Sequence, residues 1–366
     1  MHTSPRAKKY QRIKNNLFVI NLIFSLIILL AVILSGFSLW LKMRIGTITT
    51  NSIALKGIYI SALSAIFYIA GFPLEFYEGF ILEHRFKLSN QSLSSYVKDA
   101  IKKAAISLVI GLIAIEVVYL FLEKFTDVWW LLAALGWFFL TVILVKITPN
   151  VFIPLFYKYI PLKDEVLREK IKDIFAKTNT PLKDVYMIDF SSKTKKLNAA
   201  VAGFGKNRRV ILTDTLLSEL SHDEIVSIVA HELGHYKNRD TFKILVFSAI
   251  VTLVLFFLSD SVLRKSFLWF GYASIADISG FPLFALIMGI LGLLSLPLQN
   301  GFIRRLETMA DHYSLSLTKA PGIFISMMEK LSAKNLAEMN PSKFVEIMLY
   351  DHPPIAKRIS MAQKFK

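Results

Sequence analysis

The segment "IVAHELGHYKNRD", residues 228–240, places two histidines around a glutamate as His231-Glu232-x-x-His235. In a helix, residues four apart lie on one face about one turn apart, so both imidazoles can share a metal ion. Glu232 projects beside them, where its carboxylate can reach a water molecule on that metal. The pattern predicts a metal site. The alternative, a pair of structural histidines, is disfavoured because these are two of only seven histidines in the chain.

The residues before this motif predict a β-hairpin followed by a helix. Residues 198–217, "NAAVAGFGKNRRVILTDTLL", have the composition of two strands around a turn at 205–207. Ser221 and Glu224 then form a Ser-x-x-Glu capping box, which begins helices. Five apolar residues would form the buried face of that helix: Ile225, Val226, Ile228, Val229 and Leu233.

Two further segments of this region have simpler readings. Residues 163–178, "KDEVLREKIKDIFAKT", show the amphipathic spacing of a surface helix. The charge run "KTKK" at 193–196 is interpreted as a solvated loop.

A third metal ligand is needed, because a catalytic zinc takes three protein ligands and keeps one position open. The chain has no cysteine, so this ligand must be His, Asp or Glu. In "RRLETMADHYSL" (304–315), Glu307 would bind zinc and Asp311 would accept a hydrogen bond from a ligand histidine. A solvated acidic face, paired with Arg304 and Arg305, is the alternative that the spacing leaves open.

The composition indicates a protein built for a lipid bilayer. Of the 366 residues, 54% are hydrophobic and only 19% are charged. The net charge of +16 is better explained by cytoplasmic loops, which collect Lys and Arg, than by a nucleic-acid partner. The absence of cysteine also excludes disulfides and a cysteine nucleophile.

Six segments are apolar enough to cross the membrane. They are 17–41, 55–75, 104–123, 128–147, 242–263 and 281–301. We therefore expect a mainly α polytopic membrane protein that carries an α+β metalloprotease domain of the zincin type. The expected parts are a four-span region (1–147), a soluble part with the hairpin and the motif helix (148–241), two further spans (242–301) and a cytoplasmic part with the third ligand (302–366).

The loop charges predict the orientation. Five cations lie in the N-terminal tail: Arg6, Lys8, Lys9, Arg12 and Lys14. The positive-inside rule places this tail in the cytoplasm, and six spans place the C-terminus there too. Residues 148–241 and 302–366 then lie on one side and can share a site. Glu116, near the middle of the third span, is expected to be a structural partner for a Lys or polar group on a neighbouring helix.

Four motifs of the chain are shared with a known family: Asn198 through Leu217, His231-Glu232-Leu233-Gly234-His235, Glu307-Thr308-Met309-Ala310-Asp311 and Asp351-His352-Pro353-Pro354. Residues 147–162 also match, and residues 71–86 match more weakly. The chain resembles the type 1 CAAX prenyl proteases, which are integral-membrane zinc metalloproteases. The resemblance covers about residues 125–360 well and the N-terminal third loosely. Its most specific element is the asparagine-led hairpin, because many zinc proteases share the histidine motif.

The resemblance implies an intramembrane chamber that the zinc site faces. It implies that His231, His235 and Glu307 bind one zinc ion and that Glu232 is the general base. Eukaryotic members of the family have seven spans, whereas six are predicted here. The chamber is therefore expected to be smaller or more open.

The resemblance also implies how substrate is held. Asn198 and His352 would line the site and position the reacting carbonyl, so both are counted with the catalytic residues. The peptide would add as a β-strand to a segment of six residues: Asn198, Ala199, Ala200, Val201, Ala202 and Gly203.

We therefore expect a membrane-embedded zinc metalloendopeptidase related to the processing of CAAX tails. The expected partners are a peptide or protein substrate, lipidated in the CAAX reading, and membrane lipid, with no nucleic acid. A bacterial cell membrane is favoured over the endoplasmic reticulum, with the zinc site on the cytoplasmic side. Two alternatives stay open: quality control of damaged membrane proteins, as in the bacterial heat-shock proteases, and a non-catalytic scaffold or transporter.

Overall fold

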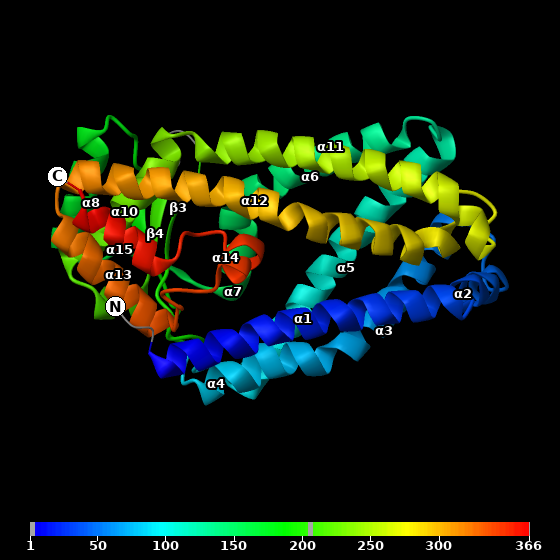
Figure 1. Ribbon diagram of the computed structural model, residues 1–366, viewed down its shortest axis with the longest axis horizontal. Coiled ribbons are helices and arrows are strands. Elements are labelled where there is room, and N and C mark those ends of the chain that lie inside the picture. Colours follow the sequence, from blue (N-terminus) through cyan, green and yellow to red (C-terminus); the bar gives the residue numbers. More distant parts are fainter. Residues whose placement is uncertain (1–3, 204–207, 366) are drawn as a thin grey trace.

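The computed structural model describes residues 4–203 and 208–365. Its shape is elongated, with long helices along most of its length and a small sheet with short helices gathered at one end (Figure 1). Both ends of the described chain lie at the end that holds the sheet. This arrangement brings segments that are far apart in sequence to the same end of the molecule.

The long helices confirm the predicted number of spans. They are α1 (Pro5–Leu34), α3 (Ser52–Phe76), α5 (Leu93–Lys124), α6 (Trp129–Ile147), α11 (Asp240–Ser266) and α12 (Phe281–Thr318). Within the described residues, six helical segments are long and apolar enough to cross a membrane. Large apolar side chains such as Ile23, Ile27 and Leu294 are exposed on their surfaces, where lipid rather than water would cover them.

The first span differs from the predicted anchor at 17–41. Helix α1 begins at Pro5, with Ser4 as its cap, so the basic tail is helical. The helix ends at Leu34, because Gly36 takes a left-handed conformation with φ of 71°. The chain then turns into the separate helix α2 (Phe37–Gly46).

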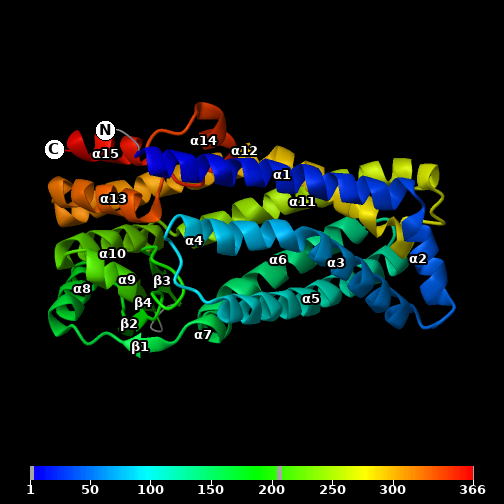
Figure 2. The same cartoon turned by 90° about the horizontal axis from the view of Figure 1, so that it is seen from below.

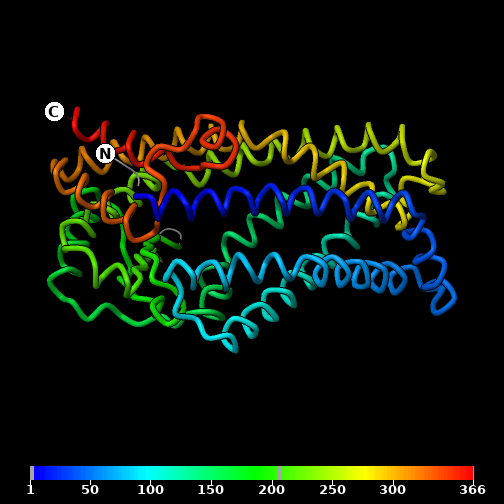
Figure 3. The backbone as a smooth tube through the Cα atoms, turned by 60° about the horizontal axis from the view of Figure 1, so that its bottom comes forward, coloured from blue at the N-terminus to red at the C-terminus, as the bar shows by residue number. Residues whose placement is uncertain are grey.

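Two spans continue into short helical pieces at the sheet end. A π-helical turn (Tyr77–Leu82) and α4 (Glu83–Arg85) extend α3, and a second π-helical turn (Thr148–Phe152) and α7 (Ile153–Phe156) extend α6. These extensions carry the membrane helices up to the sheet. The smoothed backbone shows α1 in blue and the cyan end of the α3 extension reaching the green part of the chain (Figure 3).

Glu116 has the structural partner that the sequence predicted. Its Oε2 lies 3.7 Å from Nζ of Lys56 on α3, and Glu123 accepts a hydrogen bond from the same ammonium at 3.0 Å. Lys56 is buried, and both carboxylates pair with its ammonium within the helix bundle, while Oε1 of Glu116 is buried without a hydrogen-bond partner.

Helix α12 runs without a break from the sixth span to Thr318. It therefore carries Glu307 and Asp311 on a rigid extension of a membrane helix. No helix ends near residues 301–302, where the predicted division places a boundary, and the four-part division of the chain stays a prediction.

The sheet has four strands in the order β1-β2-β4-β3. They are β1 (Tyr159–Pro161), β2 (Asp184–Ile188), β3 (Ala199–Ala202) and β4 (Arg209–Thr213). β3 and β4 pair antiparallel, with Val201 opposite Val210, as the predicted hairpin requires. The predicted turn at 205–207 lies outside the described residues. The expectation that the second strand extends to residue 217 is wrong, because Thr213 caps the short helix α9 (Asp214–Glu219).

The remaining helices lie at or near the sheet end of the molecule, with α10 between the strands and α13, and with α15 on the far side of α13 (Figure 2). They are α8 (Glu165–Lys177), α10 (His222–Lys237), α13 (Pro321–Asn335), α14 (Lys343–Leu349) and α15 (Ile355–Gln363). One hydrophobic core joins the sheet to α8, α10, α13 and α15, with Leu167, Leu212, Leu233 and Phe324 fully buried in it. The metal motif therefore lies on a helix whose other face is fixed in this core.

The run at 193–196 is not a solvated loop, contrary to the interpretation from sequence. Nζ of Lys193 lies 2.6 Å from Asp99 on α5, and Nζ of Lys196 lies 2.8 Å from Glu83 on α4. The two lysines are paired because the membrane helices bring carboxylates to the sheet end, which a sequence pattern does not show.

Candidate metal centre

Helix α10 begins at the predicted capping box. The hydroxyl of Ser221 accepts a hydrogen bond from the Glu224 N–H, and the Glu224 carboxylate accepts one from the Ser221 N–H at 2.8 Å. That carboxylate also accepts bonds from Ser326 and Lys330 on α13, both at 2.7 Å. The start of the motif helix is thereby fixed to a second helix as well as to its own backbone.

Close packing brings α10 against α12 at the motif. A Cβ on Gly234 would lie 3.0 Å from Cβ of Tyr313 and 3.1 Å from Cα of Ala310. Only glycine fits there without moving the backbone of α12. About two turns earlier on α10, the Ser227 carbonyl accepts a hydrogen bond from the Ser314 hydroxyl at 2.8 Å. These small contacts set the distance between the histidines on α10 and the acids on α12.

Three side chains converge between these helices. Nε2 of His231 lies 3.2 Å from Nε2 of His235 and 3.2 Å from Oε2 of Glu307. Nε2 of His235 lies 3.3 Å from Oε1 of Glu307. One ligand atom from each residue fits within 4.8 Å of the others, which is compatible with a shared metal ion.

The second nitrogen of each histidine faces a buried carboxylate. Nδ1 of His231 lies 2.8 Å from Asp311, and Nδ1 of His235 lies 3.0 Å from Asp240. Carboxylates accept hydrogen bonds, so both Nδ1 atoms carry the proton and both Nε2 atoms turn lone pairs toward Glu307. The two Nε2 atoms and the Glu307 carboxylate turn lone pairs toward one another, and this arrangement requires a cation between them. The residues therefore fit a metal site.

The pKa values of the histidines reflect the same convergence. Burial lowers the pKa of His231, but the hydrogen bonds to the Asp311 and Glu307 carboxylates outweigh burial and raise it to about 9. For His235, burial likewise acts to lower the pKa, while the hydrogen bond to Glu307 and its charge raise it above the usual value. Where no metal ion is bound, protons take the place of the cation.

Two residues of the site were not singled out from the sequence. Arg358 on α15 is buried and donates to both oxygens of Asp311, at 2.7 Å and 2.5 Å. Asp240, which supports His235, is also buried. Asp240 stands only five residues after His235, so its place at the start of the next helix could have suggested it. No sequence signal pairs Arg358 with an acid 47 residues away.

The carboxylates of Glu307 and Asp311 do not bond to the neighbouring Arg304 and Arg305. Arg304 donates instead to the backbone carbonyls of Glu346 and Tyr350. The alternative reading, a solvated acidic face, does not describe Glu307 and Asp311, which are both buried.

The other predicted site residues surround the same point. Glu232 lines two cavities, one of about 400 Å³ and one of about 610 Å³, so it lies between them. Asn198 and His352 line the first cavity, together with His231. Nε2 of His352 lies 3.3 Å from Glu307, and its Nδ1 bonds to Asp351 at 2.8 Å, which lowers the pKa of Asp351.

The strand beside the site has a free edge. Among the described residues, β3 pairs with β4 on one side and with no strand on the other. The Thr213 N–H bonds to the Asn198 carbonyl, and hydrogen-bonded and non-bonded pairs alternate along an antiparallel ladder. The pairs of Ala199 and Val201 are therefore non-bonded, and their N–H and C=O groups point away from β4. Ala199 lines the first cavity, and Val201 and Gly203 line the second.

Comparison with known proteins bears directly on this arrangement. Residues 161–366 match the profile of peptidase family M48. The chain belongs to peptidase family M48. Residues 2–158 match the profile described as CAAX prenyl protease N-terminal, five membrane helices. This chain is thus a membrane-embedded, multi-pass metalloprotease of the CAAX prenyl protease type, and membership of the family implies a metal ion and a peptide or protein substrate.

Individual M48 relatives cover most of the chain. It is 29% identical over 362 residues to an uncharacterized metalloprotease of Bacillus subtilis, covering 98% of this chain and 85% of that protein. It is 33% identical to a CAAX prenyl protease 1 homolog of rice, covering 80% and 69% of the two chains. The crystal structure of S. mikatae Ste24p superposes with a TM-score of 0.88 at 25% identity, covering 97% of this chain and 88% of that one.

The match to the family's N-terminal profile shows one difference in the membrane part. That profile is described by five membrane helices. In the described residues up to Phe156, this chain has four segments long enough to cross a membrane, and the ten-residue α2 between the first two.

Proposed function

We propose that the chain is a zinc-dependent endopeptidase that removes the C-terminal residues of CAAX tails at the cytoplasmic face of a bacterial membrane. One observation carries this proposal. Two imidazoles and a carboxylate converge between α10 and α12 with their lone pairs facing one another, directly beside Glu232 and the free edge of β3.

The ligand set favours zinc over other metals. Two neutral imidazoles and one carboxylate are a common catalytic zinc set, which leaves a coordination position open for water or substrate. His231, His235 and Glu307 would hold the ion, while Asp311 and Asp240 fix the histidine tautomers. When bound, zinc supplies a Lewis acid that polarises the scissile carbonyl and acidifies the attacking water.

The protein's own groups move the proton and hold the developing charge. Glu232 takes the proton of the attacking water and delivers it to the leaving amine, because its carboxylate lies beside the ligands without being one of them. His352 faces Glu307 through Nε2, and its Nδ1 is held by Asp351. With both nitrogens protonated, the ring donates from Nδ1 to Asp351 and from Nε2 to the oxyanion. Asn198, at the start of β3, holds the carbonyl of the peptide in place.

The substrate binds as an added strand. The outward N–H and C=O groups of Ala199 and Val201 supply main-chain hydrogen bonds to an extended peptide. A peptide along β3 spans both cavities, with Glu232 between them. The first cavity is lined by the apolar side chains of Leu216, Ile228, Met327, Met328 and Leu331, which suit aliphatic residues.

The CAAX class of substrate is carried over from the relatives. The rice and yeast proteins are named CAAX prenyl protease 1 homolog and CAAX prenyl protease 1. A CAAX tail has two aliphatic residues after its cysteine, in keeping with the apolar first cavity. The prenyl chain itself would lie among the membrane helices, in the chamber that the family resemblance implies.

Cleavage of a farnesylated CAAX peptide beside its unprenylated twin tests this function. We expect the purified, zinc-loaded protein to cleave the farnesylated peptide with the lower KM, and a chelator to abolish cleavage. Equal cleavage of both peptides would remove the prenyl group from substrate recognition. Cleavage of unfolded membrane-protein loops but of neither CAAX peptide would favour a role in quality control.

A further inference from the structure

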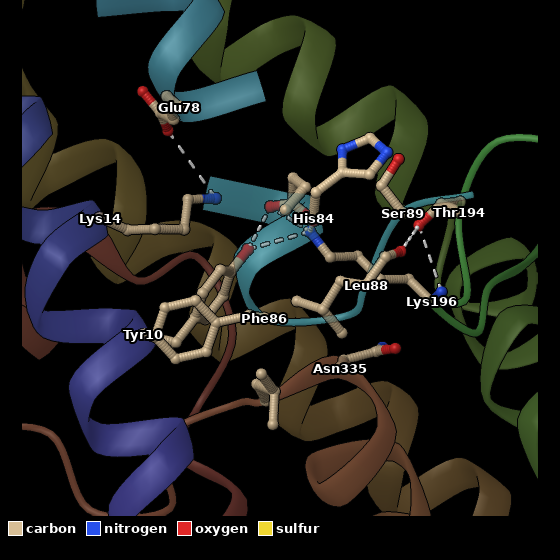
Figure 4. Close-up of polar contacts among 12 residues, drawn as sticks. Tyr10, Lys14, Glu78, His84, Phe86, Leu88, Ser89, Thr194, Lys196 and Asn335 are labelled. Carbon is tan, nitrogen blue, oxygen red and sulfur yellow. Dashed lines mark hydrogen bonds and ion pairs between the residues drawn. The ribbon is translucent and has the colours of Figure 1, made fainter. Parts of the chain in front are cut away.

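A polar cluster ties the membrane helices to the chain just before the substrate strand. Tyr10 of α1, Glu83 of α4 and Lys196 meet there, and we name these three residues the Lys196 clamp. Tyr10 and Lys196 are labelled in Figure 4. Lys196 stands two residues before Asn198, so it lies on the segment that leads into β3.

The contacts of the clamp form a closed triangle. The hydroxyl of Tyr10 donates to Oε1 of Glu83 at 2.5 Å. Nζ of Lys196 donates to the same carboxylate at 2.9 Å and to the Tyr10 hydroxyl at 3.0 Å. The Tyr10 ring is buried and packs on Phe86, so apolar packing fixes the position of the Tyr10 hydroxyl.

The backbone of the same segment is braced on both sides. The N–H of Lys195 bonds to the Leu88 carbonyl at 2.8 Å, in the loop that follows α4. Asn335, at the end of α13, accepts from the Leu197 N–H at 2.8 Å and donates to the Leu197 carbonyl at 3.2 Å. Each brace therefore lies within three residues of Asn198.

The clamp and the substrate strand are joined without a flexible residue between them. Thr215 donates from its hydroxyl to the Lys196 carbonyl at 2.8 Å. The next pairing is that of Asn198 with Thr213, where the β3–β4 ladder begins. A shift of Lys196 would therefore move the start of β3 against the metal ligands on α10 and α12.

We propose that the Lys196 clamp is a positioning device, by which helix α1 and the end of the α3 extension hold the substrate-binding edge in register with the metal centre. This inference rests on the proposed function, since it assigns the clamp to peptide binding on β3. It predicts that peptide affinity depends on three residues that do not line either cavity beside Glu232.

The charge in the clamp explains why it holds one position. The Glu83 side chain is only 14% exposed, and Lys196 is its cationic partner. Without the ammonium, the largely buried carboxylate would keep only a neutral hydroxyl as its partner, which favours movement of the segment toward solvent. Removing the charge of Lys196 therefore makes the segment before β3 more mobile. The metal ligands on α10 and α12 keep their own contacts.

The test compares Lys196→Met, Glu83→Gln and Tyr10→Phe with the parent chain. The probe is a fluorescein-labelled farnesylated CAAX peptide, whose Kd is measured on proteins that also carry Glu232→Gln, and whose KM and kcat are measured without it. We expect Kd and KM to rise about fivefold in Lys196→Met, the upper range for one partly exposed ion pair. The kcat and the zinc content stay unchanged, and Lys196→Arg keeps wild-type affinity.

The double variant Glu83→Gln with Lys196→Met tests whether the residues act as a unit. We expect its Kd to match that of Lys196→Met, because the second change removes an interaction already lost. Lys14 and Glu78 supply the matched control, since their ion pair at 4.0 Å joins α1 to the π-helical turn directly before α4 without bonding to residues 193–197. Glu78→Gln is therefore expected to leave Kd unchanged.

Two results would overturn the proposal. One is an unchanged Kd in a folded, zinc-loaded Lys196→Met protein, including one whose melting temperature falls, since this gives the clamp a purely structural role. The other is an equal loss of affinity in Glu78→Gln, which would assign the effect to the helices rather than to the clamp. Failure of the proposed function is distinguishable, because the parent protein would then neither bind nor cleave the farnesylated peptide.

Discussion

At the scale of single residues, the site depends on which nitrogen of each histidine carries the proton. Asp240 holds that proton on Nδ1 of His235 and is itself buried. Asp240→Asn keeps the size of the side chain but removes the charge that fixes the tautomer. We expect zinc affinity to fall about 10- to 100-fold, the usual cost of losing such a partner.

A zinc titration against a competing chelator measures this loss. Asp223→Asn is the matched control, because Asp223 lies on α10, the helix that carries His235, but pairs with Lys170 on the protein surface at 2.7 Å. Its zinc affinity is expected to equal that of the wild type. If Asp240→Asn also binds zinc as tightly as the wild type, Asp240 does not support the ligand.

The sequence predicted part of this site because part of it is local. His231, Glu232 and His235 lie within five residues of one another, and helical geometry alone brings them together. Glu307 could not be assigned by spacing, since adjacent arginines offered an equally good partner. Arg358 was missed because its contact with Asp311 depends on how α15 packs against α12.

At the scale of elements, the spacing between α10 and α12 decides whether the ligands meet. Gly234→Ala places a methyl group 3.1 Å from the backbone of Ala310, so one helix must move away from the other. We expect this change to destabilise the protein by about 1–3 kcal/mol, as overpacking does, and to lower zinc occupancy.

Thermal unfolding and zinc analysis of the variant check this expectation. Gly292→Ala is the control, because it is also a helical glycine but a Cβ there meets nothing within 4 Å. That variant should retain zinc and stability. A Gly234→Ala protein with wild-type zinc content and melting temperature would mean that α10 and α12 can accommodate the added methyl group without disturbing the ligands.

The free edge of β3 gives a second prediction at this scale. Val201→Pro removes an N–H that points away from β4, so substrate loses one main-chain hydrogen bond while the ladder to β4 is kept. We expect a higher KM with unchanged zinc content, and only a mild effect for Val201→Thr. Ala200→Pro, by contrast, removes an N–H bonded to β4 and should unfold the hairpin.

Peptide KM, zinc content and thermal stability on these variants separate the outcomes. An unchanged KM in a folded, zinc-loaded Val201→Pro protein would exclude strand addition at this edge. The hairpin itself was predictable from its alternating apolar pattern. The pairing of β4 with β2 was not, because β2 lies 25 residues upstream in the register that pairs Asp184 with Arg209.

At the scale of the whole molecule, hydropathy predicted the six spans but not how the first one ends. The break after Leu34 depends on one left-handed glycine, and the run from Leu17 to Leu41 contains no charge that would mark it. The lysines at 193–196 read as solvated for a similar reason. Their partners, Asp99 and Glu83, lie about 100 residues earlier on membrane helices.

The orientation in the membrane is a prediction for intact cells. We expect Thr3→Cys in this cysteine-free chain to be protected from an impermeant thiol reagent, because the positive-inside rule places the basic tail in the cytoplasm. Thr50→Cys should be labelled readily, because it lies in the exposed loop between α2 and α3, at the opposite end of the molecule. Labelling at position 3 with protection at position 50 would reverse the assigned topology.

The central claim is that His231, His235 and Glu307 hold one catalytic zinc ion beside Glu232. Zinc content per chain, measured on wild type, Glu232→Gln and Glu307→Ala purified in parallel, tests it most directly. We expect about one zinc ion per chain in wild type and in Glu232→Gln, a sharply lower content in Glu307→Ala, and no peptide cleavage by either variant. Full zinc retention in Glu307→Ala, or near-wild-type cleavage by Glu232→Gln, would contradict it.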